Sequence, residues 1–271
     1  MNPVQTWQAF QDKSLYYQAV KRDGEESCWR EIARNYDQIA YPEQQQEILC
    51  SRLMPRLEGI TSAIEIGAGP GSLTLPLARR LSKITAVEPS PAMSGVLVEK
   101  LRQQGLGNVT VLQRRWEEVN ANELPPADVV LAGGCLYVFY EIDRVLRRML
   151  AAAHTKVLLT HIGTEGLPVL EQQLADRLSL PQPCLFPPLS LVLEVLIHLR
   201  LPLEMEIFFL KRQKRWSAEQ WLERWQRLFA IPSQQRPHLL GFLEQECRKE
   251  GDLYCWEEIS PVVIIELRKT P

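Results

Sequence analysis

The sequence lacks an excess of charge of either sign. Its 271 residues include 31 basic and 33 acidic side chains, which give a formal net charge of -2. No broad cationic field therefore draws the chain to nucleic acid. The one dense basic run is KRQKRW, residues 211–216, which we interpret as a solvated strand end or turn. The sequence predicts no nucleic-acid partner.

The sequence also lacks the cysteine and histidine patterns of a metal site or a disulfide framework. It has six cysteines, none of them in a Cys-x-x-Cys pair, and four scattered histidines. We therefore expect no metal ion and reduced thiols. The N-terminal segment has no basic region followed by an apolar core, so it does not read as a signal peptide. These features favour a cytoplasmic protein.

No apolar run is long enough, without interruption, to predict a membrane span. The most apolar window is residues 185–203, which contains prolines as well as Glu194, His198 and Arg200. We interpret this window as a buried amphipathic helix of a lid, with a peripheral membrane contact as the alternative. The sequence leaves the oligomeric state open.

What the sequence does contain, from Ala63 onward, is a rhythm of short apolar runs and amphipathic segments. This rhythm is typical of repeated βα units around a parallel sheet. We predict strands at residues 62–66, 84–88, 109–112, 128–132, 156–161, 203–211 and 260–268. We predict helices near residues 71–81, 91–104, 117–121, 141–153, 167–178, 188–200 and 217–230. The predicted fold class is α/β, Rossmann-like and doubly wound, with a mostly parallel seven-stranded sheet.

One domain with elaborations accounts for a chain of this length. Residues 1–55 are polar and aromatic with helical spacing, which predicts an N-terminal helical cap. Residues 56–163 form the predicted α/β core. Residues 164–271 supply lid or insertion helices and the closing strands of the same domain.

A glycine loop follows the first predicted strand, in the segment IEIGAGPG from Ile64 to Gly71. Glycines let the chain turn sharply there, and the following helix offers unpaired N–H groups to a polar ligand. A dinucleotide fingerprint needs a glycine or alanine where this chain has Ser72, and no Gly-Lys-Ser/Thr completes a phosphate-binding loop. Glu65, two residues before the first glycine, suits a ligand with an ammonium group better than a pyrophosphate.

Glu88 ends the second predicted strand, beyond the glycine loop. An acid at such a strand end can accept hydrogen bonds from both hydroxyls of a ribose. NAD and S-adenosylmethionine both carry this ribose, so Glu88 alone does not discriminate between them. Glu88 together with Glu65 and the glycine spacing favours S-adenosylmethionine.

These motifs make the chain similar to class I S-adenosylmethionine-dependent methyltransferases, in particular to the small-molecule branch that includes the ubiquinone and menaquinone biosynthesis enzymes. The resemblance covers roughly residues 28–163. It rests on the segments AIEIGAGPGSLTLPLA, ITAVEPSPAM, VTVLQRRWEEV, ADVVLAGGCLYVFYEIDRVLRRML and KVLLTH. It implies S-adenosylmethionine as the cofactor, S-adenosylhomocysteine as its product, and an antiparallel last strand in the sheet.

The resemblance also implies a set of cofactor-binding residues. The glycine loop would lie against the methionine part and the ribose, Glu65 near the ammonium group, and Glu88 on the ribose hydroxyls. Residues 89–93 would lie along the adenine, although core packing explains Met93 equally well. The implied set is Tyr36, Glu65, Gly67, Ala68, Gly69, Gly71, Glu88, Pro89, Met93, Arg115, Trp116, Glu117 and Gly133.

The chain departs from the family at two places. After the third strand such enzymes often have an acid for the adenine amino group, and this chain has Arg115, Trp116 and Glu117 there. The backbone at Arg115 or Trp116 and the side chain of Glu117 would take that role, with capping of the core as the alternative for Trp116. The Asn-Pro-Pro-Tyr type of motif found in many nucleobase-methylating enzymes is missing, which weakens nucleic-acid targets.

Residues after the fourth strand would face the methyl group and its acceptor. Gly134, Tyr137 and Tyr140 are the predicted acceptor-binding residues. We interpret Cys135 as a small pocket residue, because no neighbouring lysine or histidine lowers the pKa of its thiol. His161 follows the fifth strand and is the best placed side chain if catalysis needs a base, with a hydrogen bond inside a loop as the alternative.

We therefore expect an enzyme that transfers a methyl group from S-adenosylmethionine to an unidentified, partly apolar small molecule covered by a lid. Two other functions stay open. One is a protein that binds S-adenosylmethionine or S-adenosylhomocysteine without transferring methyl. The other is an NAD-dependent oxidoreductase, which Ser72 and Glu65 disfavour.

Overall fold

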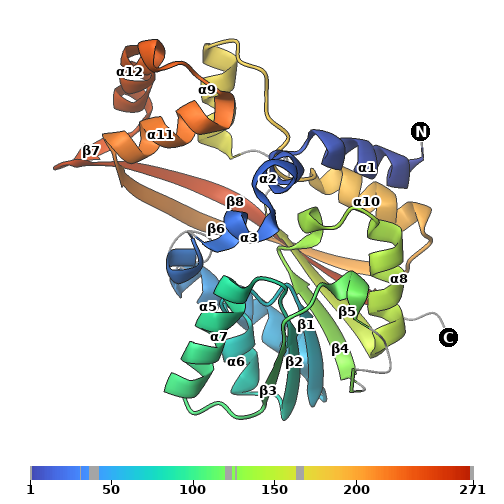
Figure 1. Ribbon diagram of the computed structural model, residues 1–271. Helices are drawn as coiled ribbons and strands as arrows, with labels where there is room; N and C mark the ends of the chain where they lie inside the picture. Colours follow the sequence, from blue (N-terminus) through green and yellow to red (C-terminus); the bar gives the residue numbers. More distant parts are fainter. Residues whose placement is uncertain are drawn as a thin grey trace.

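An eight-stranded sheet forms the centre of the computed structural model, which describes residues 2–30, 32–36, 43–119, 124–125, 127–162 and 168–268. The strand order is β3-β2-β1-β4-β5-β8-β6, and the short β7 pairs with β8 outside this path (Figure 1). The strands are β1 Ser62–Ile66, β2 Lys83–Val87, β3 Val109–Leu112, β4 Ala127–Gly133, β5 Ala153–Ile162, β6 Leu203–Ser217, β7 Arg248–Glu250 and β8 Leu253–Arg268.

The pairing of the strands confirms the predicted fold class. Strands β3, β2, β1, β4 and β5 are parallel, and β8 is antiparallel to both β5 and β6. The chain order reverses between β1 and β4, which is the point where open α/β sheets leave a crevice for a ligand. The prediction of seven strands missed β7, which has only three residues.

Helices cover both faces of the sheet. α5, α6 and α7 pack on one face, and α1, α8 and α10 pack on the other (Figure 1). The helices are α1 Pro3–Lys13, α2 Leu15–Asp23, α3 Glu25–Arg30, α5 Glu43–Leu53, α6 Thr74–Ala78, α7 Pro91–Gln103, α8 Ile142–Ala152, α9 Val169–Arg177, α10 Leu189–His198, α11 Ala218–Phe229 and α12 Arg236–Glu246. Short 3-10 turns join several of them.

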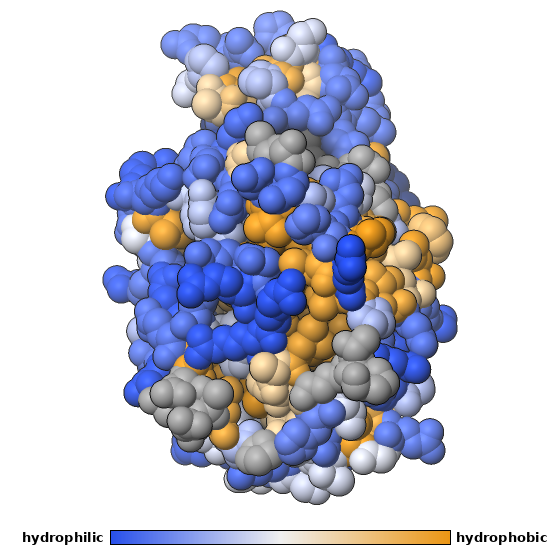
Figure 2. Space-filling model, turned by 90° about the vertical axis from the view of Figure 1, so that its right-hand side faces the viewer, coloured by the Kyte–Doolittle hydropathy of each residue, from blue (hydrophilic) through white to orange (hydrophobic). Residues whose placement is uncertain are grey.

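Helix α8 illustrates why these segments are helical. Its buried residues Ile142, Val145, Leu146 and Met149 lie three or four positions apart, so they form one apolar stripe against the sheet. The apolar helix α10 likewise buries most of one side, while Ile197 stays 67% exposed. Figure 2 views this side of the molecule and shows an apolar area in the middle of a mostly hydrophilic surface.

Among the described residues, no helix has the length and apolar character that crossing a membrane requires.

Two predicted helices are shorter than the sequence pattern indicated. α6 begins at Thr74 and not near residue 71, because Gly71 has a φ of 96°, which an α-helix does not allow. The helix predicted near residues 117–121 is a single 3-10 turn, Trp116–Glu118. Residues 120–123 are not among the described residues.

The strands β6 and β8 are much longer than predicted. They pair continuously from Leu203 opposite Leu267 to Ser217 opposite Leu253, so they leave the sheet as a two-stranded ribbon. Figure 1 shows α9, α11 and α12 gathered on the far part of this ribbon. These helices share an apolar cluster of their own, built around Trp221 and Trp225. We call this unit the outer subdomain, residues 169–177 and 212–256.

The basic run at residues 211–216 forms the last part of β6, which ends at Ser217, so the interpretation as a strand end is confirmed and the alternative of a turn was wrong. Its cations face acids on neighbouring elements. Lys211 Nζ lies 2.7 Å from Glu257, and Arg212 lies 4.0 Å from Glu258, both on β8. Lys214 pairs with Glu171 and Arg215 with Glu250. Because each cation has an acidic partner, the run is not an open cationic patch.

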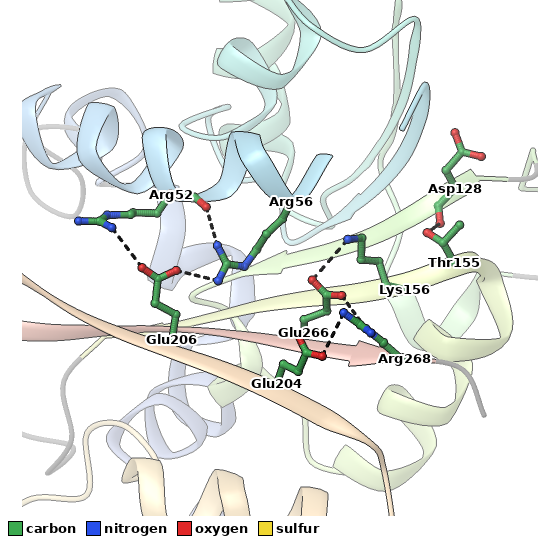
Figure 3. A network of polar contacts seen from close by, with 9 residues as sticks. All are labelled: Arg52, Arg56, Asp128, Thr155, Lys156, Glu204, Glu206, Glu266 and Arg268. Carbon is green, nitrogen blue, oxygen red and sulfur yellow. Dashed lines mark hydrogen bonds and ion pairs between the residues drawn. The ribbon is translucent and has the colours of Figure 1, made fainter. Parts of the chain in front are cut away.

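Ion pairs also fix the base of the ribbon to the core, as Figure 3 shows. Arg52 and Arg56, at the end of α5 and just after it, lie 3.3 and 2.7 Å from the two carboxylate oxygens of Glu206 on β6. Lys156 on β5 lies 3.3 Å from Glu266 on β8. These pairs join β6 to the α5 side and β8 to β5.

Replacing Glu171 should destabilise the outer subdomain. Its side chain is fully buried, with one oxygen 2.7 Å from Arg224 Nε and 3.8 Å from Lys214 Nζ. In Glu171→Ala these two cations lose their acid, so we expect the free energy of unfolding to fall by about 3 kcal/mol. The exposed pair of Lys211 and Glu257 provides the control, and Glu257→Ala should cost much less than Glu171→Ala because solvent screens this pair. Urea denaturation that gives equal losses for both variants would contradict this ranking.

Candidate functional site

The glycine loop lies between β1 and α6, at the carboxyl ends of β1 and β2. The backbone N–H groups of Gly67 and Ala68 donate to the carbonyl of Val87, at 2.9 and 3.2 Å. Gly67 and Gly69 have φ values of 66° and 57°, a region that favours glycine. A Cβ on Gly67 would lie 2.8 Å from Cys135 Cβ, whereas a Cβ on Gly69 would meet no atom within 4 Å. The loop is therefore packed at its start and open at Gly69.

Glu88 holds the loop from the end of β2. One oxygen of its carboxylate accepts a hydrogen bond from Gly69 N at 2.9 Å, and the other accepts from Ser90 N at 2.9 Å. Burial raises the pKa of Glu88, and the two backbone hydrogen bonds oppose that shift. Since a carboxylate has about four acceptor positions, each oxygen keeps one for a ligand.

Glu65 lies beneath the loop and is 2% exposed. Its carboxylate accepts a hydrogen bond from Thr74 Oγ1 at 2.7 Å. Burial raises the pKa of Glu65 to about 8; the charge of Glu88 adds to the shift, and the hydrogen bond from Thr74 opposes it. Without a nearby cation, Glu65 is therefore mostly protonated at neutral pH.

A cleft opens at the switch point, beside the loop. Its walls come from the glycine loop, the ends of β2 and β4, and the N-terminal helices. The predicted site residues that line it are Tyr36, Gly67, Gly69, Glu88, Pro89, Met93, Gly133, Gly134 and Tyr137. Cys135 lines it as expected of a small pocket residue, and Glu25, Trp29 and Val138 complete the lining.

A second hollow adjoins the cleft and shares Glu25, Gly67, Pro89 and Val138 with it. The three residues predicted on the adenine side, Arg115, Trp116 and Glu117, line this second hollow. The structure therefore brings the residues that follow the first four strands to one continuous region.

The N-terminal helices cover this region, and sequence reasoning missed the residues that hold them there. Glu25 on α3 accepts a hydrogen bond from Tyr16 at 2.7 Å and forms an ion pair with Arg115. The next residue, Glu26, accepts from Ser90 Oγ at 2.7 Å and from Ala92 N at 3.2 Å. α3 is thus attached to both sides of the region. Acids in a first helical turn are common on protein surfaces, so their sequence carried no signal of this role.

The aromatic side chains on the cap side of the cleft support one another. The ring of Tyr16 lies 5.8 Å from that of Trp29 and 5.6 Å from that of Tyr137, between ring centroids. Phe186 lies 4.9 Å from Tyr137, edge to face. Trp29 and Tyr137 are therefore held in place by neighbours that do not line the cleft.

Five predicted site residues are not among those that line the two hollows: Glu65, Ala68, Gly71, Tyr140 and His161. Gly71 faces the core, where a Cβ would lie 2.6 Å from Leu97 Cδ1. Tyr140 donates a hydrogen bond from its hydroxyl to Asp12 of α1 at 3.3 Å.

His161 lies on β5 and is 8% exposed. Burial lowers its pKa to about 4, so its ring is neutral at pH 7. Its Nε2 has no hydrogen-bond partner among the described residues. His161 therefore has the protonation state of a base, but it lines neither hollow.

In the part of the chain that the structure describes, no group of three or more His, Cys, Asp or Glu side chains could hold a metal ion.

The strand order and the loop at the switch point give the core the fold of class I S-adenosylmethionine-dependent methyltransferases. The family model described as a methyltransferase domain matches residues 63–156. This match covers the glycine loop, Glu88 and all parallel strands up to the start of β5. The resemblance drawn from the sequence motifs is confirmed.

Relatives match the core over short segments. A probable cobalt-precorrin-6B C(15)-methyltransferase (decarboxylating) of Methanothermobacter thermautotrophicus is 30% identical over 86 residues, 31% of this chain and 44% of the relative. Ribosomal RNA small subunit methyltransferase G of Streptomyces coelicolor is 42% identical over 77 residues, 28% of this chain and 31% of the relative. The chain thus matches less than half the length of its curated relatives.

One solved structure is similar over nearly the whole chain. The plantazolicin methyltransferase BpumL, in complex with SAH, covers 98% of both chains with a TM-score of 0.56 and 14% identity. At this identity the likeness concerns the fold. It extends beyond the matched domain to the segments that surround it.

Gly69 should be needed for ligand binding and not for packing. Gly69 and Gly105 have similar φ values, 57° and 66°, and neither would bring a Cβ within 4 Å of another atom. Gly69→Ala and Gly105→Ala should therefore lose a similar free energy of unfolding, about 1–2 kcal/mol. Only Gly69→Ala should weaken binding of S-adenosylhomocysteine in calorimetry. Equal affinity of the two variants would contradict the assignment of the loop.

Proposed function

We propose that this protein transfers a methyl group from S-adenosylmethionine to an unidentified, partly apolar small molecule. The observation that carries the proposal is Glu88, which fastens the glycine loop through Gly69 N and keeps acceptor positions free beside the open face of that loop. When bound, S-adenosylmethionine supplies a methyl group on a positively charged sulfur. A lone pair of the acceptor would form a bond to the methyl carbon in line with the carbon–sulfur bond, which would break and leave its electrons on the sulfur.

The residues at the cleft fit this cofactor in charge and shape. Glu88 can accept hydrogen bonds from the two ribose hydroxyls. Glu65 is buried and mostly protonated when it has no charged partner. An ammonium group beside it would favour the ionised carboxylate and form an ion pair with it. The open side of Gly69 admits a ligand against bare backbone. A dinucleotide would bring a pyrophosphate toward two buried acids, which disfavours the oxidoreductase alternative.

A small molecule suits the covered cleft better than RNA does, although several relatives that match over short segments are named as ribosomal RNA methyltransferases. The N-terminal helices are attached across the cleft through Glu25 and Glu26. The dense basic run, which lies on β6, is paired with acids. Neither feature offers a groove for a polyanion.

Methyl transfer from a sulfonium needs alignment and exclusion of water more than it needs a base, because the leaving group is already good. If the acceptor must lose a proton, His161 is the candidate base among the predicted residues. Its low pKa predicts no loss of rate between pH 8 and 5 from protonation of this ring. An unchanged rate of methyl transfer in His161→Ala would exclude His161 as a catalytic base.

Binding of both cofactor forms is the direct test of the proposal. Wild-type protein should bind S-adenosylmethionine and S-adenosylhomocysteine in calorimetry, and Glu88→Ala should bind both at least about tenfold more weakly because the ribose loses its acceptor. The exposed Glu58 gives a control, since Glu58→Ala should bind like wild type. Failure of wild-type protein to bind either form would overturn the proposal. Binding without label transfer to any acceptor would favour the non-catalytic alternative.

The role of Glu65 can be tested by its pH dependence. Because its pKa is raised to about 8, wild-type stability without ligand should fall as pH rises from about 4.5 through 8, and Glu65→Gln should not show this loss. Affinity for S-adenosylhomocysteine should show the opposite trend. It should rise with pH up to about 8 in wild type, by up to about tenfold per pH unit, and stay weak and flat in Glu65→Gln. Parallel pH profiles of the two proteins would refute an ammonium partner for Glu65.

A further inference from the structure

One side of the second hollow is a short turn with few contacts of its own. The 3-10 turn Trp116–Glu118 contains two residues that line this hollow, and Arg115, which precedes the turn, also lines it. Two backbone hydrogen bonds, of 3.0 and 3.3 Å, close the turn. Among the described residues, Arg115 at its N-cap position makes no capping hydrogen bond with its side chain. Because a single 3-10 turn has poor hydrogen-bond geometry, its position depends on side chains from other segments.

Arg148 of α8 contacts this turn twice. Its Nη1 donates a hydrogen bond to the carbonyl oxygen of Glu117 at 2.8 Å. Its Cζ lies 5.5 Å from the centroid of the Trp116 ring, within the range of a cation–π contact. One planar guanidinium therefore fixes the backbone of Glu117 and the ring of Trp116 together.

Helix α8 holds Arg148 in a defined place. Four apolar residues of this helix are at most 2% exposed and belong to the same apolar cluster as Trp116: Ile142, Val145, Leu146 and Met149. A side chain on a packed helix is positioned more precisely than one on a loop. The packing of α8 therefore transmits a fixed position through Arg148 to the turn.

The turn is also attached to the cap, but by a different kind of contact. Arg115 forms an ion pair with Glu25 of α3. This pair acts on the side chain of Arg115, whereas Arg148 acts on the backbone of Glu117 and the ring of Trp116. Arg148 is not among the described residues that line the hollow, so its effect on a ligand there must pass through the turn.

We propose that Arg148 is a positioning residue for recognition of the adenine amino group of the cofactor. This proposal rests on the proposed methyl transfer, because the sequence assigns the adenine side of the cofactor to Arg115, Trp116 and Glu117. The carboxylate of Glu117 can accept a hydrogen bond from the amino group only while the turn holds it at the hollow. A displaced turn loses that hydrogen bond, whereas Glu88 and the glycine loop keep their contacts with the rest of the ligand.

Two close analogues separate this contact from the rest of the cofactor site. S-inosylhomocysteine carries an oxygen where S-adenosylhomocysteine carries the amino group, so it offers the Glu117 carboxylate no donor at that position. Loss of a hydrogen bond to a charged group weakens binding by about tenfold or more. Wild-type protein should therefore bind S-adenosylhomocysteine at least about tenfold more tightly than S-inosylhomocysteine in calorimetry.

Variants of α8 test the role of Arg148. Arg148→Ala should reduce this preference several-fold, mainly by weakening the binding of S-adenosylhomocysteine. Arg148→Lys keeps a cation and a donor without the planar group, so its preference should lie between those of wild type and Arg148→Ala. Arg144 provides the control, because it lies on the same helix, is 74% exposed and pairs with Glu141 at the start of that helix. Arg144→Ala should keep the wild-type preference.

The ratio of the two affinities distinguishes positioning from general stabilisation. If Arg148 only stabilised the fold, Arg148→Ala would weaken both ligands equally and leave the ratio unchanged, and that result would refute the proposal. Equal affinities of wild-type protein for the two ligands would refute it as well, because the turn would then not recognise the amino group. Binding of neither ligand by wild-type protein would refute the proposed function itself.

Discussion

The carboxylate of Glu88 is the contact on which the site depends. It accepts from Gly69 N on one side and from Ser90 N on the other, so it joins the glycine loop to the start of α7. Ser90 in turn donates to Glu26 of the cap. One acid at the end of β2 thus connects loop, core helix and cap. Burial raises the pKa of Glu88, and the two backbone N–H donors oppose this shift because they stabilise the charged carboxylate in a buried position.

Much of the core could be predicted from the sequence because its signals are local. Each parallel strand is a short apolar run, and the loop after β1 is marked by glycines that positive φ values require. Residues that follow strands come together at the cleft for the same reason. Glu88, which follows β2, and Gly134, which follows β4, are examples that line it.

What could not be predicted depends on distant partners. The second half of β6 and the first half of β8 read as polar, because their charges find partners only across the ribbon and on neighbouring elements. Glu25 gains its place in the cleft from Arg115, far along the chain. Tyr137 lies in the 3-10 turn Leu136–Val138 and Tyr140 lies two residues after that turn, yet only Tyr137 lines the cleft, which the sequence spacing does not reveal.

The position of β8 has a consequence for how the chain is made. β8 lies between β5 and β6 and carries some of the most buried residues of the sheet, including Val263 and Ile265. During synthesis, β5 emerges roughly a hundred residues before its partner, so its open edge must wait while the outer subdomain forms. A nascent chain of this kind exposes the unpaired edge of an apolar strand while roughly its next hundred residues are made. Protection of that edge, by a chaperone or by transient pairing, becomes a requirement of the topology.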